Sequence, residues 1–471
     1  MEAEARPQGA DLGPGETKAP TVDRALLERE ILAVGRDLVD RFPSPARHPL
    51  RALDERAMQA STKDRELRAA LFRLVDVTPA CRSLDDLARH LTGFAAEVEA
   101  PPGPLEAAMR AARTKPGRIA LGAAVAAGVR HTAHRFIAGE TPSAALGELR
   151  RLWNDGIAAS VDLLGEATVT ASEADRYAER CADALETLAG AYAGYPQQPT
   201  LERDPAGPLP RANLSVKVTA LTPLIRADAP RRGIADAAGR LRPLLRGARE
   251  LDAHLHVDME SLDSRETTLE LFFELLAEPE FREGPSVGVV LQAYLRDAED
   301  ELRRLLAWAE GAGRRPPLTV RLVKGAYWDH EVVEARQHGW QPPVFSEKAE
   351  SDRSFEALSR SLLDRARELP ASVRVAVGSH NLRSIAHAIA YNRLAGGDDA
   401  ALEVQVLRGL GDDLAHAVAG SGLRARVYCP VGELVAGMAY LVRRLLENTA
   451  NESFLAERAG GAELDELLAA P

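Results

Sequence analysis

Hydrophobic and polar positions follow two different periods along this chain, and the period changes near residue 150. Between residues 23 and 150 apolar residues recur every three to four positions, as in LLEREILAVGRDLVDRF and ELRAALFRLVDV, which predicts amphipathic helices. Residues 1–22 show no such period and are rich in Gly, Pro and acidic residues. We therefore expect a disordered tail at 1–22 and an all-helical arm at 23–150.

After residue 150 short runs rich in β-branched residues alternate with amphipathic helical segments. Eight runs are candidate strands: IAASVDLL (157–164), NLSVKVTAL (213–221), AHLHVDM (253–259), SVGVVLQAY (286–294), LTVRLVKG (318–325), VRVAVGS (373–379), LEVQVL (402–407) and RARVYCP (424–430). Eight strand and helix units are typical of a (β/α)8 barrel. The predicted fold is thus α/β, with a (β/α)8 barrel and a C-terminal helix at 151–455, after the N-terminal all-helical arm, and a tail at 456–471.

Composition and charge narrow the classes of function. The 471 residues carry a formal net charge of -11, which argues against a general nucleic-acid-binding protein. Cys81, Cys181 and Cys429 are odd in number and far apart, which argues against a disulfide framework or a zinc module and favours a reducing compartment. No apolar run is long enough to cross a bilayer. We expect a soluble, cytoplasmic protein.

Polar residues gather where the predicted strands end. In a closed parallel barrel these ends share one mouth, where active sites lie. Burying many ionisable groups there is costly unless a ligand, a cofactor or mutual pairing compensates, so we predict a functional site. The strand-end residues are Asp162, Glu166, Lys217, Asp258, Glu260, Gln292, Tyr294, Arg321, Lys324, Ser379, His380, Gln405, Arg408 and Tyr428.

The run AYLVRRLLEN near the end of the chain places a phenol, two guanidiniums and a carboxylate on adjoining faces of one helix. These groups belong to Tyr440, Arg443, Arg444 and Glu447. Two arginines can grip a carboxylate while the tyrosine packs against the body of a small substrate, which predicts a clamp for an amino acid. A solvated helix with an ion pair between Arg443 and Glu447 is the simpler alternative.

Several of these segments together resemble the proline dehydrogenases. The longest matches are VRLVKGAYWDHE (320–331), YCPVGE (428–433) and AYLVRRLLENTANESFL (439–455), joined by LLGEA (163–167), LSVKVTAL (214–221), VLQAYLRD (290–297), GSHN (378–381) and EVQVLRGLG (403–411). The stretch LFRLVDV (71–77) is similar to the arm of the bifunctional members. The resemblance implies FAD-dependent oxidation of L-proline to Δ1-pyrroline-5-carboxylate on a (β/α)8 barrel, as the first step of proline catabolism to glutamate.

The resemblance also implies roles for single residues, and it implies no metal ligand. At the substrate, Arg443, Arg444 and Lys217 would bind the carboxylate of proline. Asp258 and Glu447 would hold these cations in place, and Tyr428, Tyr440 and Leu407 would pack on the pyrrolidine ring. At the cofactor, Arg321 would lie near the flavin N5 and Gln292 against the isoalloxazine. Further flavin contacts would come from Val323, Lys324, Gly325, Ala326, Tyr327, Trp328, Ser379, His380, Asn381, Gln405 and Leu407.

The partners implied are L-proline and a quinone that accepts the electrons. Quinone resides in the membrane, so we expect transient contact with the membrane surface, peripheral to the inner membrane. In the bifunctional members an aldehyde dehydrogenase domain follows the barrel. A stand-alone enzyme, one half of a split pair with an aldehyde dehydrogenase partner, and a piece that lacks its fused domain all stay open.

The main alternative starts from His254, His256 and Asp258, which alternate along the third strand and so point the same way. A His-x-His pair at a barrel mouth can bind a divalent metal and activate water, as in metal-dependent hydrolases of the same fold. Two hydrogen-bonded core histidines are the simpler interpretation. A Schiff-base lyase using Lys217 or Lys324, and a binding module with a degenerate pocket, are further alternatives.

Overall fold

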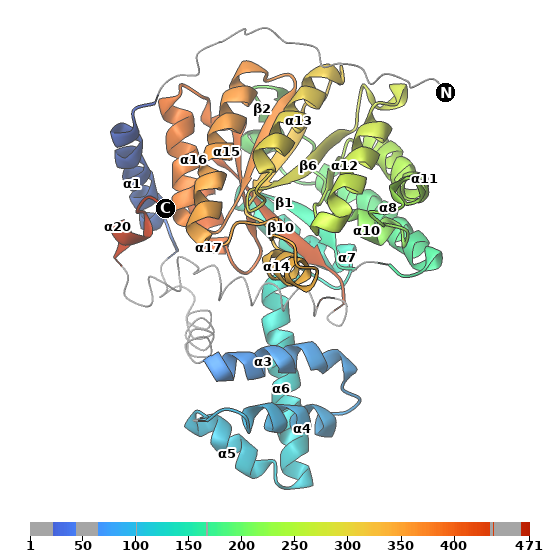
Figure 1. Ribbon diagram of the computed structural model, residues 1–471, viewed down its shortest axis with the longest axis vertical. Coiled ribbons are helices and arrows are strands. Elements are labelled where there is room, and N and C mark those ends of the chain that lie inside the picture. The colour runs from blue at the N-terminus through green and yellow to red at the C-terminus, as the bar shows by residue number, and fades with distance from the viewer. Residues whose placement is uncertain (1–21, 44–64, 100, 166–167, 434–436, 438–462) are drawn as a thin grey trace.

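A closed barrel of eight parallel strands forms the main body of the protein. The computed structural model describes residues 22–43, 65–99, 101–165, 168–433, 437 and 463–471. The strands pair in the order β1-β10-β9-β8-β7-β6-β5-β4 and close on themselves, which confirms the predicted (β/α)8 barrel (Figure 1). Their bounds are β1 (Ile157–Leu163), β4 (Asn213–Val216), β5 (His254–Val257), β6 (Ser286–Gln292), β7 (Leu318–Val323), β8 (Val373–Gly378), β9 (Leu402–Leu407) and β10 (Arg424–Val431).

The second strand ends earlier than its sequence predicts. The run 213–221 alternates β-branched and other residues, but β4 stops at Val216, and Val218–Leu221 forms the single helical turn α10. The neighbouring strand β5 also ends opposite this point, because Val216 pairs with Val257, the last residue of β5. Beyond it no partner strand continues the hydrogen-bond ladder, so the chain turns and Lys217 becomes the first residue of the mouth.

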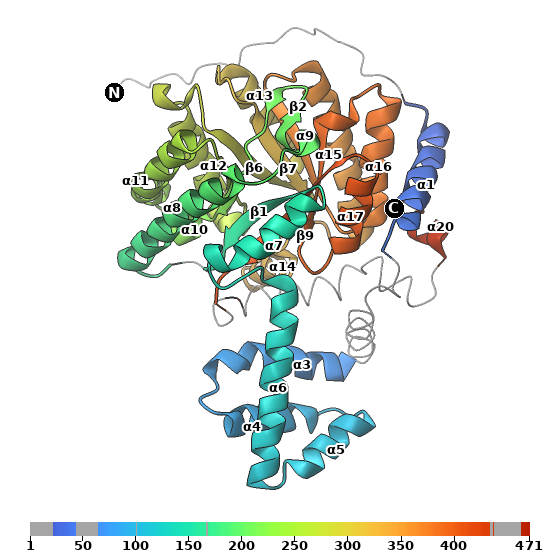
Figure 2. The same ribbon diagram turned by 180° about the vertical axis from the view of Figure 1, so that it is seen from behind.

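Helices enclose the barrel and bury the outward face of its strands. Outward residues such as Leu255 and Val289 are fully buried and belong to one continuous core with apolar residues of these helices. The surrounding helices are α7 (Pro142–Asn154), α8 (Ala171–Ala193), α11 (Pro230–Glu250), α12 (Leu262–Leu276), α13 (Ala298–Gly311), α14 (Trp328–Gln337), α15 (Lys348–Glu368), α16 (Leu382–Leu394) and α17 (Asp412–Gly420) (Figures 1 and 2). Short helical turns lie at α9 (Pro199–Glu202), η3 (Pro279–Phe281) and η4 (Asp399–Ala401).

The end of the barrel opposite the mouth is closed by a small hairpin of β2 (Arg203–Asp204) and β3 (Gly207–Pro208), seen at the top of Figure 2. Arg374 of β8 forms a buried ion pair with Asp204 at 2.7 Å and donates to the carbonyl of Pro208. Arg424 of β10 donates to the carbonyls of Thr200 and Arg203. The hairpin is therefore held to the barrel by arginines from its inner face.

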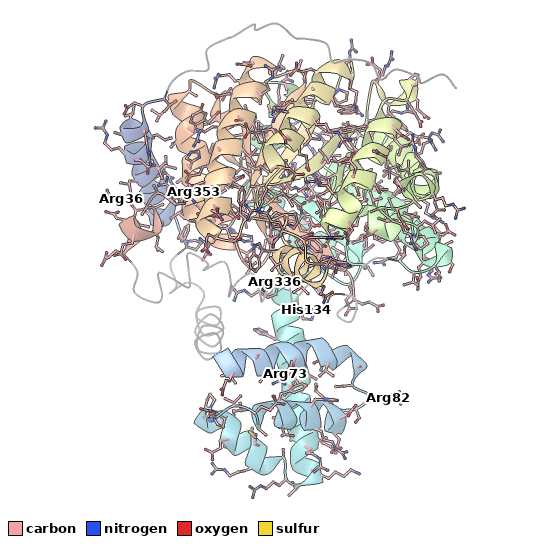
Figure 3. The ribbon with its side chains drawn as sticks, in the orientation of Figure 1. Arg36, Arg73, Arg82, His134, Arg336 and Arg353 are labelled. Carbon is pink, nitrogen blue, oxygen red and sulfur yellow. The ribbon has the colours of Figure 1, made fainter. Side chains whose placement is uncertain are left out.

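A separate helical unit lies beyond the mouth, on the side of α14 (Figure 1). It consists of α3 (Arg65–Val77), the turn η2 (Thr78–Ala80), α4 (Leu84–Ala95), α5 (Gly103–Ala111) and α6 (Lys115–Phe136). Helices α4 and α6 touch through Gly122, where an added Cβ would lie 1.9 Å from the carbonyl oxygen of Leu84. After α6, Ala138 donates to the carbonyl of Pro430, and Figure 3 shows His134 of α6 and Arg336 of α14 on this side of the barrel.

The first helix and the last described residues lie together on the outside of the barrel. Helix α1 (Arg24–Asp40) packs on α16, and the short α20 (Leu464–Leu467) packs on α1 (Figure 1). Thus α1, expected in the helical arm, contacts the barrel. Residues 463–471, expected as part of a tail, pack beside α1. The predicted division of the chain at residues 22, 150 and 455 otherwise stays a prediction. Within the described residues no helix is long and apolar enough to span a membrane.

Candidate active site

Asp258 lies at the centre of a network that joins four strand ends at the mouth of the barrel. One carboxylate oxygen accepts a hydrogen bond of 2.9 Å from Arg321 Nη1. The other accepts a bond of 2.6 Å from the phenol of Tyr428 and lies 3.4 Å from Lys217 Nζ. Asp258 and Lys217 directly follow β5 and β4, whereas Arg321 and Tyr428 lie on β7 and β10. The structure therefore brings together four residues that the sequence assigned to one site.

Lys217 is held as an ammonium ion by two carboxylates. Its Nζ forms a hydrogen-bonded ion pair with Asp162, at the end of β1, and a longer one with Asp258. Burial lowers the pKa of Lys217, but the charges of Asp162 and Asp258 outweigh burial and raise this pKa above its usual value. Lys217 therefore stays charged, and this state opposes the Schiff-base alternative, which requires a neutral amine.

Arg321 crosses the interior of the barrel. Its guanidinium nitrogens lie 3.4 Å from the hydroxyls of Ser160 on β1 and Ser215 on β4, and its Cζ lies 5.5 Å from the centre of the Tyr428 ring. Arg321 Nε and Asp162 Oδ2 are buried and have no hydrogen-bond partner among the described residues. The site thus contains one donor and one acceptor that a ligand could satisfy.

Glu260 and Gln292 form a second group beside this network. The Glu260 carboxylate accepts a bond of 2.6 Å from Thr219, and Gln292 Nε2 donates to the backbone carbonyl of Glu260 at 3.1 Å. Burial raises the pKa of the Glu260 carboxyl, which the Thr219 hydroxyl opposes. Gln292, a predicted cofactor contact, is therefore at the mouth, with its amide oriented by the loop after β5.

The turn that leaves β7 contains the next set of predicted cofactor residues. Gly325 has a φ of 133°, and a Cβ there would meet the ring of Tyr294 at 2.5 Å, so only glycine fits. Lys324 is paired with Asp352 of α15, a partner that the sequence did not indicate. Trp328 donates from its indole to the carbonyl of Phe345 at 2.8 Å. Val323, Ala326 and Tyr327 lie in the same partly buried segment.

The segment after β8 is engaged in local hydrogen bonds. Asn381 caps α16 by accepting from the backbone of Ser384 at 2.9 Å, and Ser379 accepts from the backbone of Asn381 at 3.1 Å. His380 Nε2 accepts a bond of 3.0 Å from the backbone N–H of Leu407, so its other ring nitrogen carries the proton. These bonds hold the ends of β8 and β9 together at the mouth.

Gln405 points to a deeper layer of the barrel. Its amide donates to Glu403 at 2.6 Å, and the same carboxylate forms a buried ion pair with Arg426 at 2.7 Å. The resemblance to proline dehydrogenases implied that Gln405 contacts the cofactor. In the structure its side chain completes an ion pair below the mouth, and its role at a cofactor stays a prediction.

Four residues of the predicted clamp lie outside the described residues: Tyr440, Arg443, Arg444 and Glu447. The same holds for Glu166, which the sequence placed at the first strand end. The sequence placed Asp162 at the mouth without a specific role, and it did not indicate Ser160, Ser215 or Asp352. Ser160 and Ser215 could have been found from the two-residue period of strands, because each alternates with outward-facing apolar residues. Asp352 had no such signal, since it lies on a helix far along the chain.

His254 and His256 form a hydrogen-bonded pair rather than an open metal site. His254 Nδ1 lies 2.9 Å from the Ser286 hydroxyl, and its Nε2 lies 3.1 Å from His256 Nδ1. Burial, aided by Arg426, lowers the pKa of His254 to about 3, and burial with Arg321 lowers the pKa of His256 well below its usual value. Positive neighbours oppose a metal cation, and Asp258 is bound to Arg321, so the site lacks support for the hydrolase alternative.

The described residues fit a flavin at this mouth on three observations. Arg321 has an unpartnered buried donor, Gln292 presents an oriented amide, and Gly325, in the turn that follows β7, has no side chain to obstruct a ligand and a φ of 133°. Donors and a positive charge of this kind suit the carbonyls and the ring nitrogens of an isoalloxazine. Lys324 could meet a phosphate only by exchanging its ion pair with Asp352.

Comparison with known proteins finds two matching family models and several similar proteins. The family model described as proline dehydrogenase matches residues 145–457, and that of the proline utilization A N-terminal domain matches residues 28–136. The bifunctional protein PutA of Klebsiella aerogenes is 33% identical over 353 residues, which are 73% of this chain and 25% of that protein. Proline dehydrogenase 1 of Bacillus subtilis (strain 168) is 28% identical over 335 residues, 70% of this chain and 92% of that protein.

A solved structure agrees with these relatives. The crystal structure of proline utilization A from Bdellovibrio bacteriovorus, inactivated by N-propargylglycine, superimposes with a TM-score of 0.84 at 36% identity. The match covers 94% of this chain and 44% of that one, so the chain spans less than half the length of this PutA. The resemblance seen in the sequence is therefore confirmed. Because the family model matches residues 145–457, about two thirds of the chain, the chain belongs to the proline dehydrogenase family of flavin-dependent oxidoreductases.

Proposed function

We propose that this chain oxidises L-proline to Δ1-pyrroline-5-carboxylate at a bound FAD, as the first step of proline catabolism to glutamate. The observation that carries the proposal is the network around Asp258, which unites Lys217, Arg321 and Tyr428 at the barrel mouth. The chain spans a quarter of the bifunctional relative's length but 92% of a proline dehydrogenase. The proposal therefore concerns the proline oxidation alone.

In this reaction proline loses a hydride from the ring carbon next to nitrogen and a proton from nitrogen, and a C=N bond forms. A bound flavin supplies the hydride acceptor. The residues of the chain supply position: Asp258 fixes the orientations of Arg321 and Tyr428, so the cation and the phenol ring form a rigid wall. The Lys217 ammonium offers donors to the substrate carboxylate.

We further propose that Arg443 and Arg444 bind the substrate carboxylate, with Glu447 as their partner and with Tyr440 and Leu407 beside the ring. The two arginines are suited to a carboxylate by their residue type and spacing, and the other roles follow from the resemblance to proline dehydrogenases. The same resemblance supports the assignment to the cofactor of Gln292, Val323 to Trp328, Ser379, His380, Asn381 and Gln405. Replacing Arg443→Met should raise KM for proline about 10- to 100-fold, because a charge-assisted pair of hydrogen bonds is lost. FAD affinity should change little.

The matched control for this measurement is Arg315→Met. Arg315 lies in the loop that enters β7, at the end away from the mouth, and 84% of its side chain is exposed. The control should leave both KM and FAD affinity unchanged. Equal losses of proline and FAD affinity in Arg443→Met would contradict the clamp.

The proposal extends to the electron acceptor and the location. We infer that electrons pass to a quinone and that the protein is cytoplasmic, with transient contact at the membrane surface. The resemblance implies that an aldehyde dehydrogenase, fused or separate, would use the semialdehyde formed when the product hydrolyses. The PutA relatives are named bifunctional proteins. To test the acceptor, a soluble quinone is added to the proline-reduced protein, and reduction of the quinone is followed by the change in quinone absorbance.

The central experiment uses the purified chain reconstituted with FAD. Proline added without oxygen should bleach the flavin absorbance, and the spectrum should return when a quinone is added. N-propargylglycine, which inactivated the Bdellovibrio protein, should also abolish proline oxidation by this chain. A chain that stays colourless after reconstitution, or a yellow chain that proline does not bleach, would refute the proposed function.

A further inference from the structure

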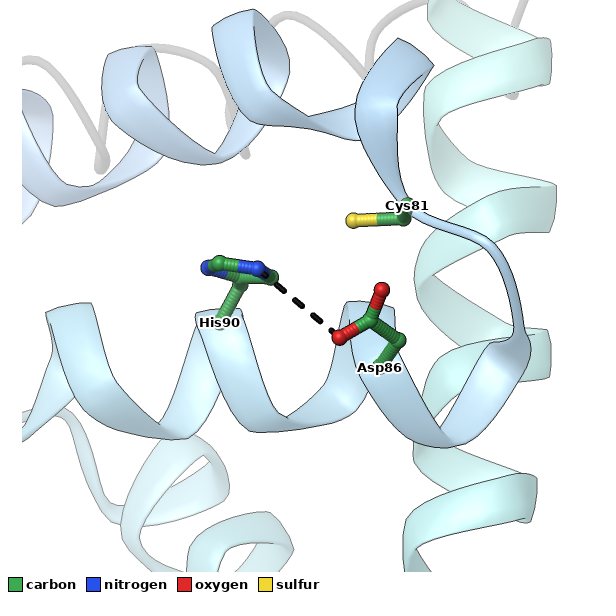
Figure 4. Close-up of side chains that lie close together, drawn as sticks. All are labelled: Cys81, Asp86 and His90. Atoms are coloured by element: carbon green, nitrogen blue, oxygen red, sulfur yellow. Dashed lines mark ion pairs between the residues drawn. The ribbon is translucent and has the colours of Figure 1, made fainter.

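Three residues of the helical unit bring metal-binding atoms together far from the barrel mouth. Cys81 follows the turn η2, while Asp86 and His90 lie on α4 (Figure 4). The Cys81 thiol, a carboxylate oxygen of Asp86 and an imidazole nitrogen of His90 all lie within 4.8 Å of one another. In the part of the chain that the structure describes, this is the only such group of three.

The local fold explains how the three atoms converge. Asp86 and His90 are four residues apart and so lie one above the other on the same face of α4. Ser83 caps the start of this helix and sets the direction in which the chain enters it. Cys81 stands just before this cap and points across to the pair on α4 (Figure 4). One ligand therefore comes from the α3 side and two from α4.

The three side chains are available for a ligand. Asp86 uses Oδ2 to accept the backbone N–H of Arg82 at 3.1 Å, which leaves Oδ1 facing His90 Nε2 at 3.9 Å. The Cys81 thiol makes only a weak bond of 3.5 Å to the carbonyl of Val77. The side chains of His90 and Asp86 are each 40% exposed, so solvent reaches the cluster. The neighbouring Asp85, by contrast, is occupied by Arg118 at 2.7 Å.

We propose that Cys81, Asp86 and His90 bind a divalent zinc ion. A thiolate, an imidazole and a carboxylate form a ligand set that zinc favours, and tetrahedral bond lengths put ligand atoms about 3.3–3.8 Å apart. The 3.9 Å between His90 and Asp86 needs only a small rotation to reach this spacing. The thiolate and the carboxylate neutralise the charge of the ion, the thiol proton is released to solvent, and water completes the fourth position.

A zinc ion here would fasten the end of α3 to α4. These elements are joined through η2 and pack through small clusters around Leu74, Leu87 and Leu91. A metal that bridges them would stabilise the helical unit without touching the proposed flavin site. The sequence indicated no metal ligand, because its three cysteines are far apart and the resemblance to proline dehydrogenases implies none. Cys81, Asp86 and His90 meet only through the turn η2 and the packing of α4.

The test uses the tag-free full chain, stripped with a chelator and titrated with Zn²⁺ against a chromophoric competitor. It should bind one zinc ion per chain with a Kd of about 1 μM or lower. Cobalt should produce a thiolate charge-transfer band. Cys81→Ser should abolish this band, and Cys81→Ser, His90→Gln and Asp86→Asn should each weaken zinc binding at least about tenfold.

The matched control is His134→Gln, an exposed histidine of α6 in the same helical unit. It should bind zinc as the unchanged chain does, and circular dichroism should show that all variants keep their helices. Failure to bind zinc, a cobalt spectrum without a thiolate band, or equal affinity in Cys81→Ser and His134→Gln would overturn the proposal. None of these measurements depends on flavin or proline, so the result is independent of the proposed oxidation.

Discussion

Single residues inside the barrel are stabilised by ion pairs whose partners come from distant parts of the chain. Arg374 meets Asp204, and Arg426 meets Glu403, with side-chain exposures below 10%. A buried ion pair adds little stability compared with apolar residues at the same positions, but removing one partner leaves the other charge buried and unpaired. The interior is thus sensitive to the loss of either charge.

Arg374→Met should lower the free energy of unfolding by about 3–5 kcal/mol, because Asp204 would stay buried without its partner. Urea denaturation measures the change. Arg315→Met, which removes a highly exposed pair with Glu283, should leave the unfolding midpoint unchanged. If both variants lost the same stability, burial of the pair would not be the cause.

Buried histidines should make stability fall in mild acid. Burial, with Arg360 and Arg383, lowers the pKa of His387 to about 3, whereas an unfolded histidine has a pKa of about 6.5. Between these values the unfolded chain binds more protons, so the free energy of unfolding decreases as pH falls. From pH 7 to pH 5.5, His387 should account for about 1.3 kcal/mol of the loss.

His387→Gln keeps a hydrogen-bonding side chain but removes this titration. The variant should therefore lose about 1.3 kcal/mol less stability than the unchanged chain between pH 7 and pH 5.5, measured by urea unfolding at both values. Parallel pH dependences of the two proteins would show that His387 does not titrate in this way.

At the level of elements, some glycines stand where no side chain would fit, whereas others stand where a side chain would have open space. Gly288 of β6 faces His256, and an added Cβ would lie 2.2 Å from the imidazole and 2.9 Å from the Thr319 carbonyl. Gly239 in the middle of α11 has no atom within 4 Å of such a Cβ. Both are glycines within regular elements, but only one of them is required by its surroundings.

Gly288→Ala should destabilise the protein by about 1–3 kcal/mol, since the strand or the imidazole must move. Gly239→Ala should instead stabilise it by about 0.5–1 kcal/mol, because alanine loses less conformational freedom in a helix. Thermal unfolding of the two variants compares them directly. Destabilisation by Gly239→Ala, or tolerance of Gly288→Ala, would contradict this account of the packing.

In the whole molecule, Arg383 of α16 connects both ends of the described chain to the barrel. It binds Glu28 of α1 at 2.7 Å, Glu356 of α15 at 2.8 Å and the carbonyl of Leu468 at 2.7 Å. The Leu468 side chain is buried against Gly35, and a Cβ added at Gly35 would lie only 2.6 Å from it. One side chain therefore supports α1 and α20 together.

Arg383→Met should release these two segments at the same time. Hydrogen exchange should increase in Arg24–Asp40 and in Leu464–Leu467, while the strands of the barrel keep their protection. Arg36→Met, which removes an exposed pair with Asp465, is the control and should leave the exchange of both segments nearly unchanged. Faster exchange of only one segment in Arg383→Met would refute the shared support.

The sequence by itself determined the barrel, because eight β-rich runs alternating with amphipathic helices have few other ways to bury their apolar faces. It also indicated Lys217, Asp258, Arg321 and Tyr428, since parallel strands end at one mouth. Only the tertiary structure decided which of these groups meet, that Asp162 and Asp352 compensate the lysines, and that Gln405 turns to a deeper ion pair. The tertiary structure also decided that Cys81 lies beside Asp86 and His90 of α4. Such pairings depend on side chains far apart in sequence, whose contacts follow from strand register and helix packing and have no local pattern.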